Sequence, residues 1–257
     1  MSHQVSASHH PFQHGVLYDY HRSSACYRVR IALHLLDIPY QKVSVNLLES
    51  EQTAAGFINP MHAVPFWQDE HIGLSQSLAI IEYLNESVSE DDGASLLPDD
   101  RQQRAQCRAL AQIVACDIHP LNNLRVLKYL AAVNASSDDA NTATSRSPLD
   151  LTDSSCSTNR GALTNRSNKP MIDRQHWYHH WLAAGFNAYE ANLSDTLFSC
   201  GDVPTLADVC LIPQLYNARR FAFSLDSYPK IQAIETRCLQ LPAFINAQPE
   251  VAAEQSA

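Results

Sequence analysis

The sequence predicts a small α/β domain followed by an all-helical domain. Two observations support this division. Between residues 15 and 90, runs with strand character alternate with runs of helical periodicity, which is typical of an α/β unit. From residue 91 to 257 the pattern is helical, apart from a polar segment at 134–170. We expect that segment to be a flexible insertion, and residues 1–14, which are polar and rich in histidine, to be a disordered tail.

The composition indicates in which cell compartment the protein is expected and which partners are disfavoured. The 257 residues carry a formal net charge of -9, which disfavours binding to nucleic acid or to an anionic membrane surface. Seven cysteines, an odd number without any Cys-x-x-Cys pair, are more typical of a reducing cytoplasm than of a disulfide framework. No apolar run approaches the roughly 20 residues of a membrane span. We therefore expect a cytoplasmic protein without nucleic-acid or membrane partners.

The α/β domain opens with a strand over Val16–Tyr20 and a helix over Ser24–Leu36. This helix has apolar residues at helical spacing and polar or charged residues between them: Val29, Leu33 and Leu36, and Arg28, Arg30 and His34. After Pro39, which follows the end of the helix, the alternating run Tyr40–Val45 predicts a second strand. Since a crossover helix joins the two strands, they should be parallel.

The rest of this domain is predicted to be a β-β-α unit. A weakly helical stretch over 51–57 leads to a third strand near Val64-Pro65-Phe66-Trp67. A turn at Asp69-Glu70 precedes a short strand over His71–Leu74, and a helix over Ser75–Glu86 follows. The sheet should therefore contain two parallel and two antiparallel strands, with helices packed on its faces.

A polar linker over 88–98 separates this domain from the helical one. The run Arg101–Leu130 has helical periodicity, and Pro120 should kink or split it. Three more helical segments follow, the second of them preceded by the capping-box spacing of Thr205 and Asp208: Met171–Leu193, Val209–Tyr216 and Pro229–Leu239.

The junction between the first strand and the first helix is the strongest candidate site. Ser23 and Ser24 are natural N-cap residues, so their hydroxyl groups should lie at the start of the helix. That end of a helix has unpaired backbone N–H groups and the positive pole of the helix dipole. It can therefore hold an anion, to which a serine hydroxyl can donate a hydrogen bond. By their spacing alone, these serines would be interpreted only as a helix cap.

Four motifs together resemble the cytosolic glutathione transferases. They are the run Arg22–Leu33, the pair Val64-Pro65, the run Ser75–Leu84 (Ser-Gln-Ser-Leu-Ala-Ile-Ile-Glu-Tyr-Leu) and the run Thr205–Asp208 (Thr-Leu-Ala-Asp). The first motif narrows the resemblance to the zeta class, and the likeness covers nearly the whole chain except the tail and the insertion. The family implies a thioredoxin-like N-terminal domain that binds glutathione, a helical C-terminal domain, and a homodimer.

The resemblance also implies where the sulfur of glutathione would lie. Ser23 and Ser24 match the serine pair beside the sulfur, where a helix start and a hydroxyl can lower a thiol pKa from about 8.5 toward neutrality. The family often has a cysteine after this pair, but here that position is Ala25, and Cys26 comes one residue late. One residue rotates a helical side chain by about 100°. We therefore do not assign the role of the family's cysteine to Cys26.

Other residues match the peptide-binding positions of the family. Val64, before a Pro65 that is cis in this fold, matches the residue whose backbone pairs with the cysteinyl unit. Gln76 and Ser77 match the residues that hold the γ-glutamyl end, and Gln52 roughly matches a glutamine that contacts the peptide. The alternative interpretations are an edge-strand proline at 65 and a plain helix start at Gln76 and Ser77.

Residues near the substrate can also be matched to the family. Arg22, before the serine pair, and Arg220, in the second domain, match arginines that lie near the acidic substrate, and arginine suits carboxylates. His119, Asn123 and Arg125 belong to a segment that the family places over the cofactor sulfur. The alternatives are surface solvation for the arginines and ordinary packing for His119.

Two other polar groupings are given structural interpretations. His176, His179 and His180 have a spacing that could chelate a metal, but the His-Glu-x-x-His motif is absent, so we expect an exposed polar face and no metal. Asp208 is expected to cap a helix and not to act as a catalytic acid.

The resemblance implies the glutathione-dependent cis–trans isomerisation of maleylacetoacetate to fumarylacetoacetate, a step in tyrosine and phenylalanine breakdown. The substrate is a small acid with an activated cis double bond, to which a thiolate can add and from which it can leave, so that glutathione is a cofactor. Ser23, Ser24, Arg22 and Arg220 would be the catalytic residues. Three alternatives remain open: the same reaction on maleylpyruvate, a general glutathione-conjugating transferase, and a binding protein without turnover.

Overall fold

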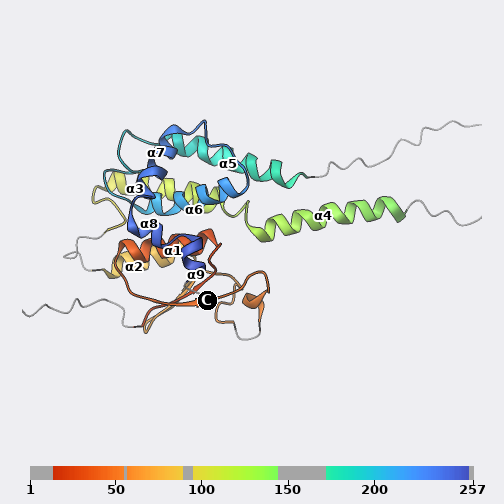
Figure 1. Ribbon diagram of the computed structural model, residues 1–257, viewed down its shortest axis with the longest axis horizontal. Helices are drawn as coiled ribbons and strands as arrows, with labels where there is room; N and C mark the ends of the chain where they lie inside the picture. The colour runs from red at the N-terminus through yellow and green to blue at the C-terminus, as the bar shows by residue number, and fades with distance from the viewer. Residues whose placement is uncertain (1–13, 55–56, 89–94, 144–171, 255–257) are drawn as a thin grey trace, which may run out of the picture.

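The computed structural model describes residues 14–54, 57–88, 95–143 and 172–254, with the backbone alone for 135–143. A four-stranded sheet lies at one end of the molecule, and helices are stacked beyond it (Figure 1). We call the sheet and its two covering helices the α/β layer, and the helices beyond them the helical bundle. The predicted tail and most of the predicted insertion lie outside the described residues.

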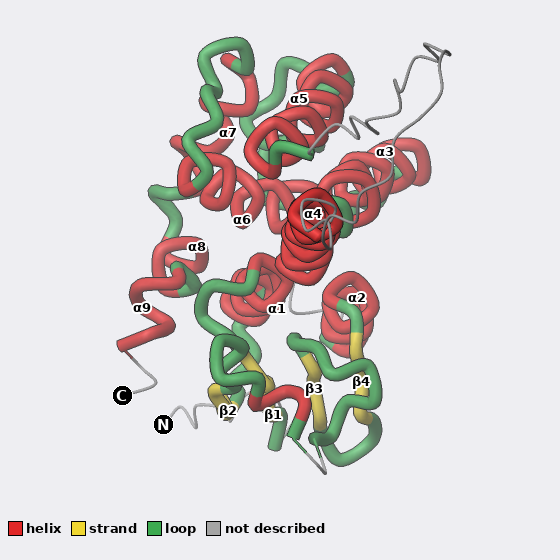
Figure 2. The backbone as a smooth tube through the Cα atoms, turned by 90° about the vertical axis from the view of Figure 1, so that its right-hand side faces the viewer, coloured by secondary structure: helices red, strands yellow, loops and turns green. Residues whose placement is uncertain are grey.

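The sheet has the mixed topology that the sequence predicts. Its short strands lie in the order β2-β1-β3-β4 (Figure 2): β1 Val16–Asp19, β2 Gln41–Ser44, β3 Phe66–Gln68 and β4 Gly73–Ser75. β1 and β2 are parallel, with Val16 opposite Gln41, whereas β3 pairs antiparallel with both β1 and β4. The predicted combination of parallel and antiparallel pairs is therefore confirmed.

Two helices, α1 (Ser24–Leu35) and α2 (Ser77–Ser87), cover the same face of the sheet (Figure 2). Both begin within two residues of the predicted positions. Of the weakly helical stretch expected at 51–57, only the short 3-10 turn η1 (Glu51–Thr53) is helical. The loop around this turn runs from β2 to β3 and forms part of the site described below.

The helical run predicted over Arg101–Leu130 is split next to Pro120, as expected. α3 (Arg101–Gln112) continues into a π-helical turn, η3 (Ile113–Ile118), and α4 (Leu124–Ala143) begins after a break. α4 continues into the segment predicted to be a polar insertion and extends away from the rest of the bundle (Figure 1). Once the first turn of a helix has formed, each added residue contributes its own hydrogen bond, so the polar sequence can remain helical there.

Five more helices belong to the described part of the chain: α5 (Arg174–Ala191), α6 (Leu206–Arg220), α7 (Pro229–Cys238), α8 (Pro242–Asn246) and α9 (Pro249–Glu254). α6 begins with the predicted capping box, in which buried Asp208 accepts hydrogen bonds from the backbone N–H (2.8 Å) and the hydroxyl (3.0 Å) of Thr205. The structural role expected for Asp208 is therefore confirmed. None of the helices in the described ranges combines the length and apolarity needed to cross a bilayer.

The short helices α8 and α9, which the sequence analysis did not predict, turn back onto the α/β layer (Figure 2). Three side chains of the layer donate hydrogen bonds to carbonyl groups of this segment: Tyr27 to Phe244 (3.4 Å), Arg30 to Ala247 (3.0 Å) and Lys42 to Ala252 (2.5 Å). The end of the described chain is thereby attached to its beginning.

The sequence pattern placed Arg28 and Arg30 between the apolar positions of α1, as on a polar face, but both side chains are buried. The reason is that α1 lies between α2, α6 and α8 and packs against all three. A helix surrounded by protein has no solvent-facing side, and the sequence of one helix does not reveal how many neighbours surround it. The two arginines therefore belong to the interior, where each needs polar partners.

Candidate active site

A cavity of about 400 Å³ opens between the α/β layer and the helical bundle. Its walls come from the start of α1, the loop 47–64, the start of α4 and the end of α6, which are far apart in the sequence. The start of α1 contributes Arg22, Ser23, Ser24 and Ala25. The strand–helix junction that the sequence analysis selected therefore forms one wall of the cavity.

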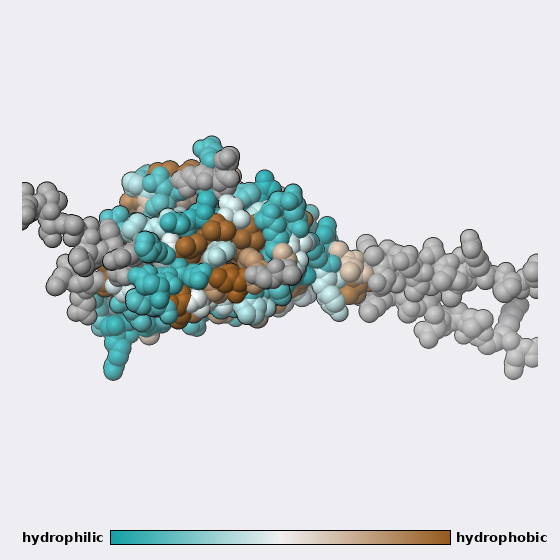
Figure 3. All heavy atoms as spheres, turned by 90° about the horizontal axis from the view of Figure 1, so that it is seen from below, coloured by the Kyte–Doolittle hydropathy of each residue, from teal (hydrophilic) through white to brown (hydrophobic). Residues whose placement is uncertain are grey.

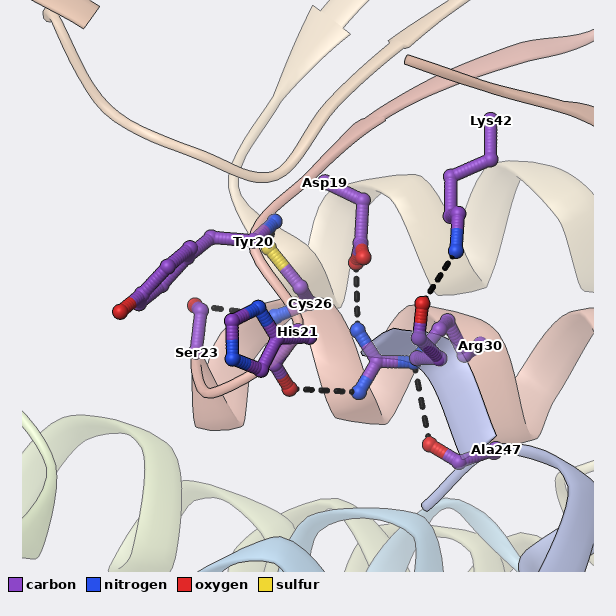
Figure 4. A network of polar contacts seen from close by, with 9 residues as sticks. Asp19, Tyr20, His21, Ser23, Cys26, Arg30, Lys42 and Ala247 are labelled. Carbon is purple, nitrogen blue, oxygen red and sulfur yellow. Dashed lines mark hydrogen bonds and ion pairs between the residues drawn. The ribbon is translucent and has the colours of Figure 1, made fainter. Parts of the chain in front are cut away.

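The hydroxyl groups of the two serines have different partners. Ser23 is the N-cap of α1, and its Oγ accepts a hydrogen bond from the backbone N–H of Cys26 (3.3 Å; Figure 4). Ser24 is buried, and its Oγ lies 2.9 Å from Nδ1 of His119. The oxygen of Ser23 thus caps the helix, whereas the hydroxyl of Ser24 is held by a residue of the bundle.

His119 follows the π-helical turn η3 and faces the start of α1. Burial, assisted by the nearby charges of Arg28 and Arg125, lowers the pKa of His119 to about 3. The imidazole is therefore neutral at pH 7. Its Nε2 lies 3.5 Å from Nδ2 of Asn123, and Oδ1 of Asn123 accepts a hydrogen bond from the backbone N–H of Arg125 (3.1 Å) at the first turn of α4.

Cys26 does not reach the cavity. Its side chain is fully buried, and its Sγ accepts a hydrogen bond from the backbone N–H of Tyr20 (3.5 Å; Figure 4). Burial raises the pKa of this thiol, so it stays protonated at neutral pH. Ala25, at the position of the family's cysteine, does line the cavity but has no reactive group. The start of α1 therefore offers hydroxyl groups and no protein thiolate.

A buried arginine ties the serine turn to the rest of the fold (Figure 4). Arg30 pairs with Asp19 at the end of β1 through Nη1 and Oδ1 (2.5 Å), and both side chains are only 1% exposed. It also donates to the carbonyl of His21 from Nη2 (3.0 Å) and to that of Ala247 from Nε (3.0 Å). The strand end, the turn before Ser23 and the segment after α8 are thus joined through one guanidinium group.

Long cationic side chains line the same cavity. Arg22 precedes α1, and Arg220 is the last residue of α6. Arg125 and Lys128 lie about one turn apart at the start of α4. All of them are exposed, and none forms an ion pair with another described residue. Since no Asp or Glu in the described ranges lines the cavity, its positive charge favours an anionic ligand.

The loop 47–64 presents polar groups that have no partner within the described chain. Oε1 of Gln52 is buried and accepts no hydrogen bond from the described residues. The backbone N–H and C=O of Val64 likewise pair with no other described residue. The Val64–Pro65 peptide bond is cis, as the resemblance implies. Both Gln52 and Val64 line the cavity, so their unpaired groups lie in its wall.

The start of α2 lies outside this cavity. Gln76 precedes the helix with a φ of 75° and is exposed, whereas Ser77 is buried and its Oγ accepts a hydrogen bond from Nη1 of Arg28 (3.3 Å). The other two guanidinium nitrogens of Arg28 have no partner among the described residues. Of the residues selected from the sequence, the cavity brings together Arg22, Ser23, Ser24, Gln52, Val64, His119, Asn123, Arg125 and Arg220, but not Pro65, Gln76 or Ser77.

Several lining residues were not selected from the sequence. Lys128 could have been found, because it lies three residues after Arg125 and therefore on the same side of a helix. Tyr178, Gln214 and Asn217 come from α5 and α6 and belong to no local motif. Only the packing of the bundle brings them to the cavity.

The sheet is mixed, a cis proline precedes its third strand, and a cavity lined by cationic side chains lies between it and the helical bundle. These features place this protein in the class of thioredoxin-like transferase folds. Residues 17–91 match the family model "Glutathione S-transferase, N-terminal domain", and residues 182–242 match "Glutathione S-transferase, C-terminal domain". The chain belongs to the glutathione S-transferase family. The fold class predicted from the sequence is confirmed.

Related proteins extend this similarity to nearly the full chain. The chain is 38% identical over 241 residues to a probable maleylacetoacetate isomerase of Vibrio cholerae, covering 91% of this chain and 95% of the relative. A holo structure of a bacterial zeta-class maleylpyruvate isomerase is 36% identical with a TM-score of 0.74, covering 92% and 97% of the two chains. The maleylacetoacetate isomerase of Anaeromyxobacter dehalogenans, solved with dicarboxyethyl glutathione and citrate, is 32% identical with a TM-score of 0.72, covering 94% of each chain. The resemblance to the zeta class is thereby confirmed.

Proposed function

We propose that this protein is a glutathione-dependent cis–trans isomerase that converts maleylacetoacetate to fumarylacetoacetate, in tyrosine and phenylalanine breakdown. The observation that carries the proposal is the cavity itself. It combines a helix start, with the Ser24 hydroxyl and Arg22, on one side and the cations Arg125, Lys128 and Arg220 of the helical bundle on the other, without a carboxylate in the described lining. A thiolate and a small dicarboxylate are the anions that such a pair of walls suits.

The residues present fit glutathione. The unpaired backbone of Val64 has the donor and the acceptor that an extended peptide needs in order to pair with it. The free, buried Oε1 of Gln52 can accept a hydrogen bond from a peptide N–H or an ammonium group. The start of α2 at Gln76 and Ser77 has the positive pole that suits an α-carboxylate. These groups would hold the tripeptide with its sulfur toward Ser24.

Glutathione, when bound, supplies a thiolate that adds reversibly to the activated alkene and so permits rotation about the former double bond. The protein's own residues hold the two reactants and their charges. Ser24 can donate a hydrogen bond to the sulfur, which favours its anionic form. Arg22 and Arg220 would hold the carboxylates and stabilise negative charge that develops on the substrate, with Arg125 and Lys128 contributing to the same field.

The test is turnover of maleylacetoacetate by the purified full chain, with and without glutathione. We expect isomerisation only with glutathione and no net consumption of the tripeptide over many turnovers. Equal rates in its absence, or no turnover in its presence, would contradict the proposal. Steady consumption with a chloroarene such as 1-chloro-2,4-dinitrobenzene, without isomerisation, would indicate a conjugating transferase. Comparison with maleylpyruvate distinguishes the two acids, since a related structure is named for that substrate.

We further propose that the protein is a homodimer in the cytosol. Leu48 and Met61, in the loop of the α/β layer, are 68% and 54% exposed. Figure 3 views the molecule from the side of this layer and shows apolar atoms gathered among hydrophilic ones. A second subunit would remove such apolar surface from water. Light scattering on the purified chain should give twice the mass of one chain, and cell fractionation should recover it with cytosolic markers.

A further inference from the structure

The donor and the acceptor in the hydrogen bond between Ser24 and His119 can be assigned from the groups around them. A neutral histidine carries one proton, on either Nδ1 or Nε2, and the group facing each nitrogen decides which. Nδ1 faces Oγ of Ser24 at 2.9 Å, and Nε2 faces Nδ2 of Asn123 at 3.5 Å. A serine hydroxyl can either donate or accept, so Ser24 does not determine which nitrogen of His119 is protonated.

Asn123 determines which ring nitrogen of His119 carries the proton. Its Oδ1 accepts a hydrogen bond from the backbone N–H of Arg125 (3.1 Å), which caps the first turn of α4 and fixes the orientation of the amide group. The amide nitrogen therefore faces His119, and an amide nitrogen can only donate. Nε2 of His119 must then be the acceptor, so the single proton of the neutral ring lies on Nδ1.

We propose that His119 and Asn123 are positioning residues that orient the hydroxyl proton of Ser24 toward the cavity. Nδ1–H of His119 donates to Oγ of Ser24, and an oxygen that accepts from one side keeps its own O–H for another partner. No other described residue forms a hydrogen bond with this hydroxyl. The free O–H is then available to a thiolate in the cavity, with no need to break an existing bond first.

The surroundings keep this arrangement in one protonation state. Burial and the charges of Arg28 and Arg125 lower the pKa of His119 to about 3, so the ring does not gain a second proton near neutral pH. A protonated ring would also have to place an N–H against the amide group of Asn123, which has no acceptor on that side. The role assigned to the sulfur rests on the proposed function, whereas the direction of the hydrogen bonds can be measured in the protein alone.

The first experiment reads the tautomer by nitrogen NMR of the full chain, labelled with 15N-histidine and without ligand. The signals of His119 are identified by their loss in His119→Asn. We expect Nδ1 to carry the proton and Nε2 to show the shift of an unprotonated ring nitrogen. A proton on Nε2 would overturn the proposal, whether or not the protein binds glutathione.

A substitution at the cap should reverse the tautomer. In Asn123→Asp both side-chain oxygens accept, and aspartate caps a helix as well as asparagine does. We expect the ring proton of His119 to move to Nε2, where it can donate to the carboxylate. Asn123→Ser, which keeps a capping oxygen without an added charge, is the matched control and should not place the proton on Nε2. An unchanged tautomer in Asn123→Asp would show that Asn123 does not set it.

A pair of substitutions at His119 then tests the effect on the sulfur. The amide nitrogen of Asn overlays Nδ1 of histidine, whereas that of Gln overlays Nε2, so only His119→Asn keeps the donor to Ser24. We measure the pKa of the thiol of bound glutathione from the ultraviolet absorbance of the thiolate. We expect His119→Gln to raise that pKa by about 1, as for the loss of one hydrogen bond to a charged group, and His119→Asn to leave it near the wild-type value. Equal effects of both variants would overturn the positioning role, while a lack of glutathione binding by the wild type would contradict the proposed function instead.

Discussion

The two walls of the cavity are built in different ways. On the side of α1, Ser23 and Ser24 are short side chains whose oxygens already have hydrogen-bond partners. On the side of the bundle, Arg125, Lys128 and Arg220 are long, exposed and without ion pairs in the described part of the chain. Immobilising such a side chain on a ligand costs up to about 2 kcal/mol of rotamer entropy, whereas a held hydroxyl costs little. In the proposed function, the sulfur would therefore meet hydroxyl groups that are already held in place, whereas the exposed cations would lose side-chain freedom when they hold the carboxylates.

Arg30 holds the cavity wall that is formed by Ser23 and Ser24 at the start of α1. Of the substitutions below, Arg30→Met is expected to change the free energy of unfolding most. This change leaves the buried carboxylate of Asp19 without its partner, which should lower the free energy of unfolding by about 3–5 kcal/mol. Denaturant unfolding measures it. The matched control is Arg108→Met, which breaks the half-exposed pair with Glu82 and should cost less than about 1 kcal/mol. Similar losses of unfolding free energy in both variants would show that burial of the ion pair does not set the size of the loss.

Ser24→Ala should reduce kcat/KM for the proposed isomerisation by about 100-fold, because it removes a preorganised donor to negative charge. Ser23→Ala should act mainly through the fold. It removes the cap of α1 and should lower the free energy of unfolding by about 1 kcal/mol. Steady-state kinetics and denaturant unfolding of both variants separate the two roles. Full activity in both variants would exclude the hydroxyl groups from the mechanism.

The cations on the bundle side of the cavity should affect binding of the dicarboxylate and not the pKa of the glutathione thiol. Arg220→Met and Arg125→Met should each raise KM for the dicarboxylate about tenfold, since each removes one carboxylate contact of moderate strength. The pKa of the thiol of bound glutathione should stay unchanged. Arg101→Met, on the exposed start of α3 and outside the cavity, is the control for a general loss of positive charge. A changed thiol pKa with an unchanged KM would contradict the division between the two walls.

Lowering the pH should reduce the stability of the folded protein through His119, which joins the two walls of the cavity. This is the smallest expected effect. Burial holds the pKa of His119 near 3 in the folded state, against 6.5 for an ordinary histidine. The unfolded chain therefore binds a proton that the folded chain does not, and stability falls as the pH drops below 6.5. Between pH 6.5 and 5.5 this one group should cost about 1 kcal/mol. His119→Asn should lose that part of the pH dependence in denaturant unfolding, and identical pH profiles would show that His119 is not buried in its neutral form.

Much of the fold could be predicted because its signals are local. The strand–helix order, the split next to Pro120 and the capping box at Thr205 and Asp208 each depend on residues within a few positions of one another. The helices α8 and α9 were not predicted, since they are short and gain their stability by packing on the α/β layer. The burial of Arg28 and Arg30 was missed for a related reason, because it depends on the helices that surround α1.

The sequence by itself determined that a pair of hydroxyl groups would stand at the start of a helix after a strand, because capping preferences and periodicity act over a few residues. It also carried the motifs from which the family could be recognised. Only the tertiary structure decided what faces those hydroxyl groups. It placed His119 against Ser24 across 95 positions of sequence and brought Lys128 to the same cavity as Arg220. The physical reason is that hydrogen-bond direction and charge density depend on neighbours in space, which are chosen by the packing of whole helices.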